Sequence, residues 1–257
     1  MQLDLADKVA IVTGASRGIG RAIARVLAAE GMRVAVVART KAELDTLAAE
    51  IGEDCLVQVA DLREPLTPVV VVETVAAHFG RLDLLVNNAG TSKRGDFLTL
   101  TEADWVEGFG LKFYGAMRLC GAAWPYLRRS GGSIVNIAGL GGRTGNAEFA
   151  IGGAVNAALL NLTKVLADRG VRDGVRVNAI NPGGIKTGRL QTRLRTFAAE
   201  RGLQPEEAER EMARAFGVAR FGEPEEIARL VAFLASPQAA FCQGSLIDAD
   251  GGQTRTL

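Results

Sequence analysis

Three glycines near the start of the chain have the spacing of a phosphate-binding turn. Gly14, Gly18 and Gly20 follow a short apolar run, residues 9–12, and open a segment with helical periodicity. Glycine has no Cβ, so the backbone can turn sharply and approach a bound pyrophosphate closely. The free N–H groups and the positive dipole end of the following helix favour the phosphate charge. A glycine turn between a strand and a helix therefore predicts a dinucleotide site.

The residues after the second predicted strand indicate which dinucleotide this site takes. An NAD site usually has an Asp or Glu there, which binds the free ribose hydroxyls. Here Arg39 follows the strand at 33–37, and no acid stands beside it. Arg39 can form charge-assisted hydrogen bonds to a 2′-phosphate, and Arg17 in the glycine turn can add a second cation. The sequence favours NADP(H) over NAD(H), with two ordinary solvated arginines as the alternative.

Strands and helices alternate along the chain, and no linker separates them. The predicted strands are 9–12, 33–37, 56–59, 82–86, 133–137, 175–180 and 245–247. The predicted helices are 18–30, 41–51, 66–79, 101–129, 148–169 and 225–234, with two short helices within 187–218. Continuously apolar strands are typical of parallel sheets that are covered on both faces. We expect one α/β domain over residues 1–257: a Rossmann-like, doubly wound, seven-stranded parallel sheet with helices on both faces and ligands at the carboxyl ends of its strands.

The composition argues against several classes of protein. With a net charge of +1, the chain offers no electrostatic case for nucleic acid or an anionic membrane as a partner. No uninterrupted apolar run approaches the roughly 20 residues of a transmembrane helix, and the N-terminus lacks a signal pattern. One histidine and three scattered cysteines predict no metal site and reduced thiols. We expect a cytoplasmic protein.

Four motifs along the chain resemble those of one enzyme family. They are Thr13-Gly14-x-x-x-Gly18-x-Gly20, Asn87-Asn88-Ala89-Gly90, Val177-Asn178-x-x-Asn181-Pro182-Gly183 and Asp250-Gly251-Gly252. Together they look like the short-chain dehydrogenase/reductase family over almost the whole chain. The resemblance implies a Rossmann fold, a nicotinamide dinucleotide and a small-molecule substrate. It also implies a homotetramer or homodimer, in which helices at about 103–129 and 148–169 form a four-helix interface.

The resemblance assigns cofactor contacts by position. It places Asp61 beside the adenine ring, Asn88 near the adenosine ribose and Thr187 at the nicotinamide carboxamide. The other predicted cofactor residues lie in the same motifs or next to them. They are Gly14, Ser16, Arg17, Gly18, Ile19, Gly20, Arg39, Leu62, Ala89, Gly90, Pro182, Gly183 and Ile185.

The family's catalytic residues are missing from the matching positions. The family uses an Asn, a Ser that orients the substrate oxygen, and a Tyr-x-x-x-Lys pair that moves the proton and holds the ribose. In this chain Lys112 stands at the Asn position and Gly139 at the Ser position. Gly152 and Asn156 stand at the Tyr and Lys positions. No tyrosine follows Tyr126, so a change of register does not restore the pair.

Lysine and asparagine have thus exchanged places between two positions that face each other in the family. One hypothesis is that Lys112 supplies the ammonium that binds the nicotinamide ribose, while Asn156 becomes its polar partner. The other is that both residues are products of drift. The exchange restores no proton donor, and positioned acid–base catalysis is typically worth about 10²–10⁴-fold in rate.

Three side chains are candidates for the missing acid. Glu148 is predicted one helical turn before Gly152, and its pKa would be raised if the carboxyl were desolvated. Lys112 can donate a proton if burial lowers its pKa, and Tyr114 is close to Lys112 in sequence. A structural role is the alternative for all three.

Residues 187–218 match the family's substrate lid and carry many charges of both signs. The basic residues are Arg189, Arg193, Arg195, Arg201, Arg210 and Arg214. The acidic residues are Glu200, Glu206, Glu207, Glu209 and Glu211. A surface helix of mixed charge accounts for most of them, and an anionic substrate such as a carboxylate or an acyl thioester is the alternative.

We therefore expect an atypical oxidoreductase that transfers a hydride between NADP(H) and a small carbonyl or activated C=C substrate. It would work without the family's Ser, Tyr and Lys. The rival hypothesis is a catalytically silent dinucleotide-binding protein that acts as a sensor or a partner subunit. Hydride transfer that depends on Glu148 or Lys112 would favour the enzyme.

Overall fold

The computed structural model describes residues 2–91 and 93–255, and at its centre is a parallel sheet of seven strands. The strands are β1 Val9–Thr13, β2 Arg33–Ala38, β3 Cys55–Val59, β4 Leu84–Asn87, β5 Ser133–Ile137, β6 Arg176–Pro182 and β7 Leu246–Ala249. Their order across the sheet is β3-β2-β1-β4-β5-β6-β7. The order reverses between β1 and β4, the place where a doubly wound sheet binds its ligands. The predicted fold class is confirmed.

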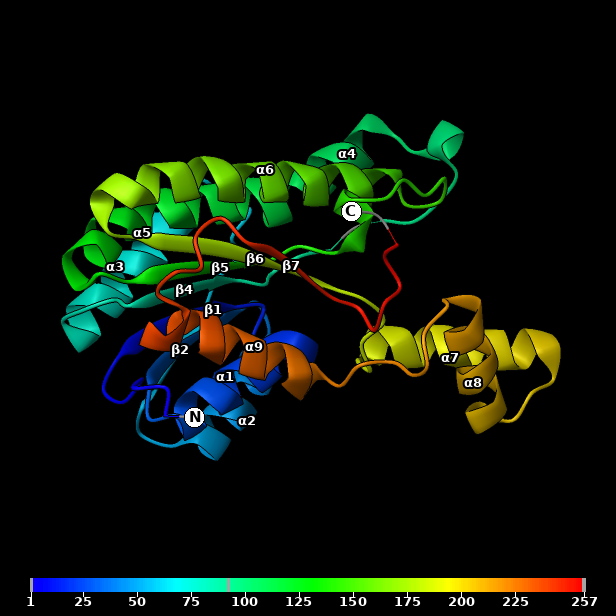
Figure 1. The fold of residues 1–257 in the computed structure, drawn as a ribbon, viewed down its shortest axis with the longest axis horizontal. Coiled ribbons are helices and arrows are strands. Elements are labelled where there is room, and N and C mark those ends of the chain that lie inside the picture. The colour runs from blue at the N-terminus through cyan, green and yellow to red at the C-terminus, as the bar shows by residue number, and fades with distance from the viewer. Residues whose placement is uncertain (1, 92, 256–257) are drawn as a thin grey trace.

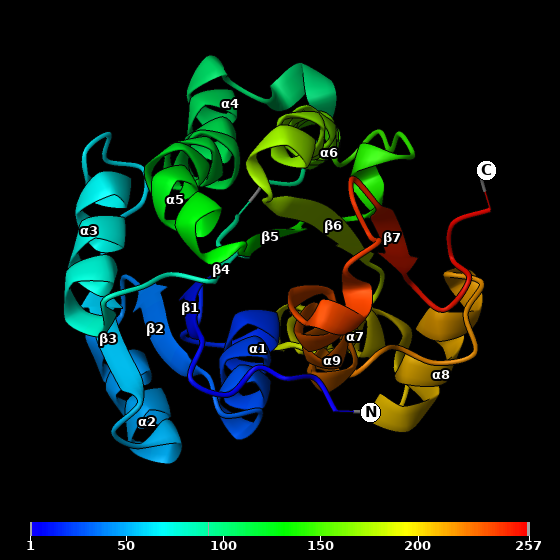
Figure 2. The ribbon, with the colours of Figure 1, turned by 60° about the vertical axis from the view of Figure 1, so that its left-hand side comes forward.

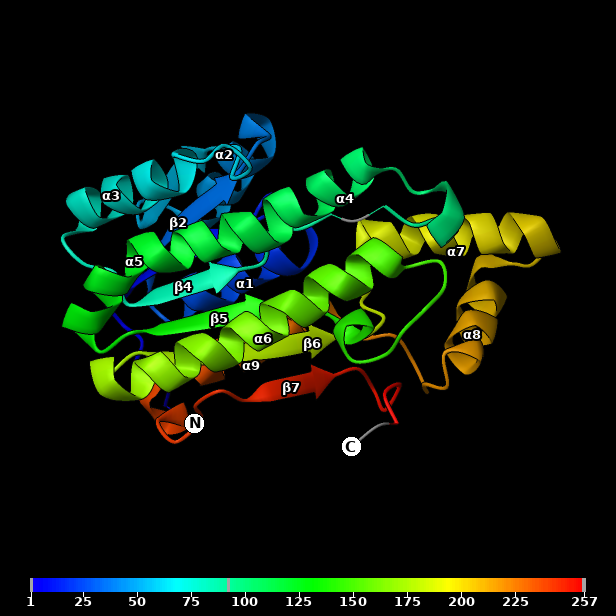
Figure 3. The same ribbon diagram turned by 90° about the horizontal axis from the view of Figure 1, so that it is seen from above.

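Helices cover both faces of the sheet, which gives the molecule three layers (Figure 2). The helices α1, α2 and α9 lie on one face, and α3, α4, α5 and α6 lie on the other. Their bounds are α1 Gly18–Ala29, α2 Lys41–Ile51, α3 Thr67–Phe79, α4 Glu102–Phe109, α5 Ala116–Ser130, α6 Ala150–Asp173 and α9 Pro224–Ala235. The strands run toward the end of the molecule where the remaining helices, α7 Gly188–Arg201 and α8 Pro205–Ala215, are found (Figure 3).

Alternate residues of the central strands enter two separate cores. Val12 and Val36 pack with α1 and α9 in one core. Ile11 and Val37 pack with α3 and α5 in the other. Because successive side chains of a strand point to opposite faces, strands covered on both sides are apolar without alternation. This is why apolar runs alone predicted the central strands.

The turn after β1 is held open by glycines. Gly14 and Gly18 have φ values of +65° and +57°, a region that side chains with a Cβ rarely adopt. A Cβ on Gly20 would collide with the carbonyl oxygen of Gly14 and with the Asn88 amide. Gly20 therefore lets α1 start directly against the end of the sheet.

A buried hydroxyl joins β1 to the segment after β4. The Thr13 hydroxyl donates a hydrogen bond to the Val86 carbonyl (3.1 Å) and accepts from the backbone N–H groups of Asn88 (2.9 Å) and Ala89 (3.0 Å). The Asn88 side-chain amide donates to the carbonyl oxygens of Thr13 (2.9 Å) and Gly14 (3.3 Å). Two of the sequence motifs are thereby fixed against each other.

The helix predicted at 101–129 contains an irregular turn in its middle. α4 begins behind a capping box between Thr101 and Asp104. A π-helical turn, Gly110–Gly115, then separates α4 from α5. Such turns are rare and frequently lie at functional sites. This one contains Lys112, and a regular helical repeat could not have predicted it.

The lid segment forms two helices, α7 and α8, which project from the body of the molecule (Figure 1). They enclose a small apolar cluster of their own, made of Leu190, Met212, Ala213, Val218 and Phe221. Both ends of the lid meet at one point, where the backbone N–H of Lys186 donates to the Gly222 carbonyl (2.8 Å).

Within the described residues, α6 is the one helix that is long and apolar enough to cross a membrane by length and composition. It is also a core helix, because Ile151, Val155 and Leu159 are buried. Its outer face keeps Val165 and Val171 exposed. The packing against the sheet accounts for its apolar inner face without a membrane.

We predict that Thr13→Val lowers the free energy of unfolding by about 2 kcal/mol or more. The methyl group cannot accept from the two amides, and a buried unsatisfied donor costs about 1–3 kcal/mol. Thr46→Val is the matched control, because the Thr46 hydroxyl only donates to the Ala42 carbonyl on an exposed helix surface. Urea unfolding of both variants measures the difference. Equal losses for the two would contradict the role of Thr13.

Candidate active site

The glycine turn, the segment after β4 and the segment after β6 converge at the amino end of α1. Asn88 bonds to the turn, and a Cβ built on Gly18 would lie 3.1 Å from the Thr187 methyl carbon. Arg17 precedes α1 and is exposed, and no side chain caps the helix. The free backbone N–H groups of α1 therefore face a glycine-lined cradle, which suits a pyrophosphate.

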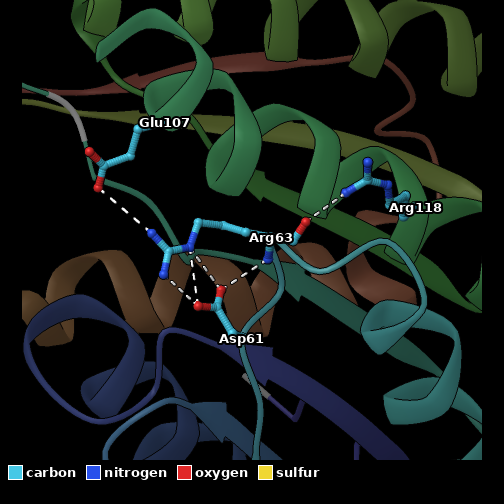
Figure 4. Close-up of polar contacts among 4 residues, drawn as sticks. All are labelled: Asp61, Arg63, Glu107 and Arg118. Carbon is cyan, nitrogen blue, oxygen red and sulfur yellow. Dashed lines mark hydrogen bonds and ion pairs between the residues drawn. The ribbon is translucent and has the colours of Figure 1, made fainter. Parts of the chain in front are cut away.

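The side of this cradle nearest β3 is organised by an ion pair (Figure 4). Arg63 donates to the Asp61 carboxylate from Nε (3.0 Å), from Nη2 (2.6 Å) and from its backbone N–H (3.1 Å). These bonds lower the pKa of Asp61. Glu107 lies 3.8 Å from Arg63, and Arg118 donates to the Arg63 carbonyl oxygen (3.1 Å). Asp61 is thus held as a fixed anion at the carboxyl end of β3.

Arg39 immediately follows β2 and is exposed. Its charge contributes to the lowered pKa of Asp61, which places it beside the same end of the cradle. Among the described residues no acid lies within ion-pair distance of Arg39. Leu62, by contrast, is buried in the core at 3 % exposure, so only its backbone is available to a ligand.

Lys112 lies at the opposite end of the cradle. Its ammonium donates to the Ala138 carbonyl oxygen at 2.7 Å, and its methylene carbons lie against Gly90, where a Cβ would be 2.9 Å from Cδ. Burial, and secondarily the charge of Arg189, lower the pKa of Lys112 to about 7. One ammonium proton is bonded to Ala138, which leaves two for other acceptors.

Asn156 lies on the other side of the same carbonyl group. A Cβ built on Gly139 would be 3.1 Å from the Asn156 amide nitrogen. Asn156 is 4 % exposed, and its buried Oδ1 has no hydrogen-bond partner in the part of the chain that the structure describes. Because buried polar atoms are rarely left unpaired, this oxygen and the glycine cradle both fit a bound dinucleotide.

Arg189, the second residue of α7, closes the cradle from the lid side. Its Nη2 donates to the Gly90 carbonyl oxygen at 2.6 Å. Burial and the nearby Arg17 lower the pKa of Arg189. Within residues 2–91 and 93–255, no three His, Cys, Asp or Glu side chains are grouped as a metal site would need. The site is therefore lined by cations and backbone groups.

Comparison with known sequences agrees with this geometry. A family model described as enoyl-(acyl carrier protein) reductase matches residues 14–254. The chain is 36 % identical to an uncharacterized oxidoreductase of Mycobacterium tuberculosis over 255 residues, which cover 97 % of this chain and 93 % of the relative. It is 37 % identical to an acetoacetyl-CoA reductase of Rhizobium meliloti, with 96 % and 98 % covered.

A solved structure is similar over the full length. The L-sorbose reductase of Gluconobacter frateurii, crystallised with NADPH and L-sorbose, superposes with a TM-score of 0.95 at 33 % identity and covers 100 % of both chains. The chain belongs to the short-chain dehydrogenase/reductase family. This is a family of oxidoreductases, and the convergence of the four sequence motifs at one end of the sheet follows from its fold.

The remaining predicted cofactor residues of this short-chain dehydrogenase/reductase occupy different environments. A Cβ on Gly183 would lie 2.7 Å from the Asp250 Cα, so the third and fourth motifs pack together. Ile185 is 8 % exposed and belongs to the core. Ser16, Ile19 and Pro182 are half-buried around the cradle.

The predicted position of Glu148 is wrong. α6 begins at Ala150, so Glu148 lies in the preceding loop and is exposed. The spacing of one helical turn from Gly152 therefore does not apply, and the carboxyl is not desolvated. The Phe149 ring instead fills the space where a Cβ on Gly152 would lie. Its ring also lies close to Gly141, where a Cβ would be 2.8 Å from Cδ1.

Tyr114 is separated from Lys112 as well. It is 44 % exposed, and the Arg118 guanidinium lies 5.6 Å from the centre of its ring. Residues two apart on a helix do not face each other, and the π-helical turn keeps these two apart.

Sequence reasoning missed Arg63 and Phe149. The signal for Arg63 was its place two residues after Asp61, the distance of a local side-chain bridge. Phe149 gave no signal, because its role depends on the missing side chain of Gly152.

A double-mutant cycle tests the position of the Phe149 ring. Gly→Ala inside a helix normally stabilises by about 1 kcal/mol, but a Cβ at Gly152 has to displace the ring. We predict no gain for Gly152→Ala alone and a gain of about 1 kcal/mol in a Phe149→Ala background. Gly121→Ala serves as the control, because no atom lies within 4 Å of that Cβ. Thermal unfolding measures all four states, and identical effects of Gly152→Ala in both backgrounds would refute the packing.

Proposed function

We propose that this short-chain dehydrogenase/reductase is an NADP(H)-dependent oxidoreductase in which Lys112, and not a tyrosine, moves the proton. The supporting observation is the Lys112 ammonium, which is fixed at 2.7 Å from the Ala138 carbonyl and has its pKa lowered to about 7. A group with that pKa is half protonated near neutral pH, where general acid–base catalysis is most efficient.

The cofactor proposal rests on charge at both ends of the cradle. Arg39 stands without an acidic neighbour within ion-pair distance among the described residues, and Arg17 is exposed beside the turn. Guanidinium groups bind phosphate through charge-assisted, often bidentate bonds. A ketoreductase of actinorhodin biosynthesis, 31 % identical with a TM-score of 0.90, was also solved with NADPH. When bound, the cofactor supplies or accepts a hydride.

The chain's own residues divide the remaining tasks. The unpartnered Oδ1 of Asn156 accepts a hydrogen bond from a ribose hydroxyl, the task that the exchanged lysine performs in the family. Lys112 donates a proton to the oxygen of a small carbonyl substrate, or supports the developing charge on the carbonyl of an activated C=C substrate. The absence of side chains at Gly139 and Gly152 means that neither contributes to this path. Glu148, exposed in the loop, is left outside it.

The rival function keeps the cofactor and abandons the chemistry. It is favoured by the Phe149 ring, which fills the space beside Gly152 where the family places its tyrosine. A silent protein would bind NADPH and leave it unoxidised with ketones, enones and enoyl thioesters.

The assembly that we propose is a homotetramer or homodimer in the cytoplasm. Its interface is formed by α5 and α6, where an apolar depression is lined by Met117, Trp124, Leu162 and Leu166. No lipid or nucleic-acid partner enters this proposal.

The choice of cofactor is tested by Arg39→Ala. We expect NADPH affinity to fall by about 1.5–3 kcal/mol, the worth of hydrogen bonds to a charged group, while NADH affinity barely changes. Titration calorimetry with both cofactors measures this. Arg25→Ala, which removes an exposed arginine from α1, controls for net charge. An equal loss for both cofactors would rule out a 2′-phosphate contact.

The role of Lys112 is tested by the pH profile of ketone reduction with NADPH. Because only the ammonium form donates a proton and its pKa is about 7, kcat/KM should fall about tenfold per pH unit above pH 7. Lys112→Arg stays protonated at every accessible pH and should lose both rate and the fall. Lys164→Met, at an exposed position of α6, should leave the profile unchanged. A fall that persists in Lys112→Met would assign the proton to another group.

A further inference from the structure

Two arginines on different segments face each other beside the Phe149 ring. The Arg94 guanidinium lies 4.4 Å from the centre of that ring. Partial burial and the charge of Arg193, on the lid helix α7, lower the pKa of Arg94. The two cations are therefore neighbours across the opening between the body and the lid.

The surrounding structure fixes this pair in place. The Gly95 backbone N–H donates to the Glu148 carbonyl oxygen at 3.1 Å, which ties the loop that carries Arg94 to the loop that carries Phe149. On the lid, the Arg193 guanidinium lies 5.3 Å from the centre of the Phe216 ring. Both arginines are thus held by aromatic faces, which position a guanidinium without neutralising it.

Acidic partners for the pair are scarce. Within the described residues, neither arginine has a carboxylate at ion-pair distance, while the adjacent Lys93 is paired with Asp104 at 3.0 Å. Glu148 influences Arg94 only at longer range. Two like charges held close together repel each other, and a bound anion would relieve that repulsion.

The pair lies at a useful place relative to the reacting centre. The Phe149 ring touches the space above Gly152 on one side and carries Arg94 on the other. A substrate whose reacting carbon lies near Lys112 can extend along this ring toward the arginines. Arg189, bonded to the Gly90 carbonyl, stands between the two ends and adds to the positive potential.

We propose that Arg94 and Arg193 bind a carboxylate at the far end of the substrate, so that the enzyme acts on oxo acids or unsaturated acids rather than on neutral ketones. The planar fork of a guanidinium matches the two oxygens of a carboxylate. This inference names the substrate class of the proposed function and in that respect rests on it.

Binding of an unreactive dicarboxylate tests the site without requiring turnover. We would titrate the protein with glutarate, and with dimethyl glutarate as its neutral match, both with and without saturating NADPH. We expect glutarate to bind and the diester not to bind. Arg94→Gln combined with Arg193→Gln should weaken glutarate binding about 10- to 100-fold. Lysine at both positions should restore part of the affinity, because it keeps the charge and loses the fork.

Arg210→Gln is the matched control, since it removes an exposed lid arginine on α8, and it should change glutarate affinity less than twofold. With 4-oxopentanoate and its methyl ester as substrates, the double variant should raise KM for the acid and leave kcat nearly unchanged. That pattern marks binding that is equal in the ground and transition states.

The outcomes separate this inference from the proposed function. Glutarate binding that is absent, or that the double variant leaves intact, overturns the carboxylate site even if NADPH binds and ketones are reduced. Arginine-dependent glutarate binding without NADPH binding supports the carboxylate site and overturns the cofactor proposal.

Discussion

The structure depends on the close contact between the end of β1 and the end of β4. One hydroxyl, that of Thr13, bonds to three backbone groups there, and the Asn88 amide bonds to the glycine turn from the other side. This contact is possible only because Gly20 has no Cβ. It fixes the start of α1, and with it the direction in which unpaired N–H groups point. The phosphate cradle is therefore a by-product of how two central strands are joined at their ends.

The electrostatics of the site follow from where its charges are placed. At the end near β3, Asp61 and Arg63 neutralise each other and form a rigid wall. At the other end, Lys112, Arg189 and Arg17 lie close enough to depress one another's pKa values in sequence. Such a gradient suits a ligand with phosphates in the middle. It also keeps the ammonium of Lys112 near its titration point.

Local patterns were sufficient to predict the fold and the phosphate end of the site. Apolar runs located the strands because both faces of the sheet are covered, and the glycine motif carries its own backbone requirement. The π-helical turn around Lys112 and the start of α6 at Ala150 were not predictable, because both depend on packing between distant segments. The same holds for Arg94, whose interest lies in Phe149 and Arg193 rather than in its own neighbours in sequence. The sequence identified which family residues were absent, while only tertiary contacts indicate what stands in their place.

The lid has its own apolar cluster and joins the body through one narrow junction at Lys186 and Gly222. A unit built in this way can change its sequence with little effect on the sheet, since few of its contacts cross the junction. Selection can then alter the substrate opening while the cofactor cradle stays constant. Mutational tolerance should accordingly be uneven along the chain, high on the outer faces of α7 and α8 and low at the turn after β1. The fold thus separates the part that diversifies from the part that must be inherited intact.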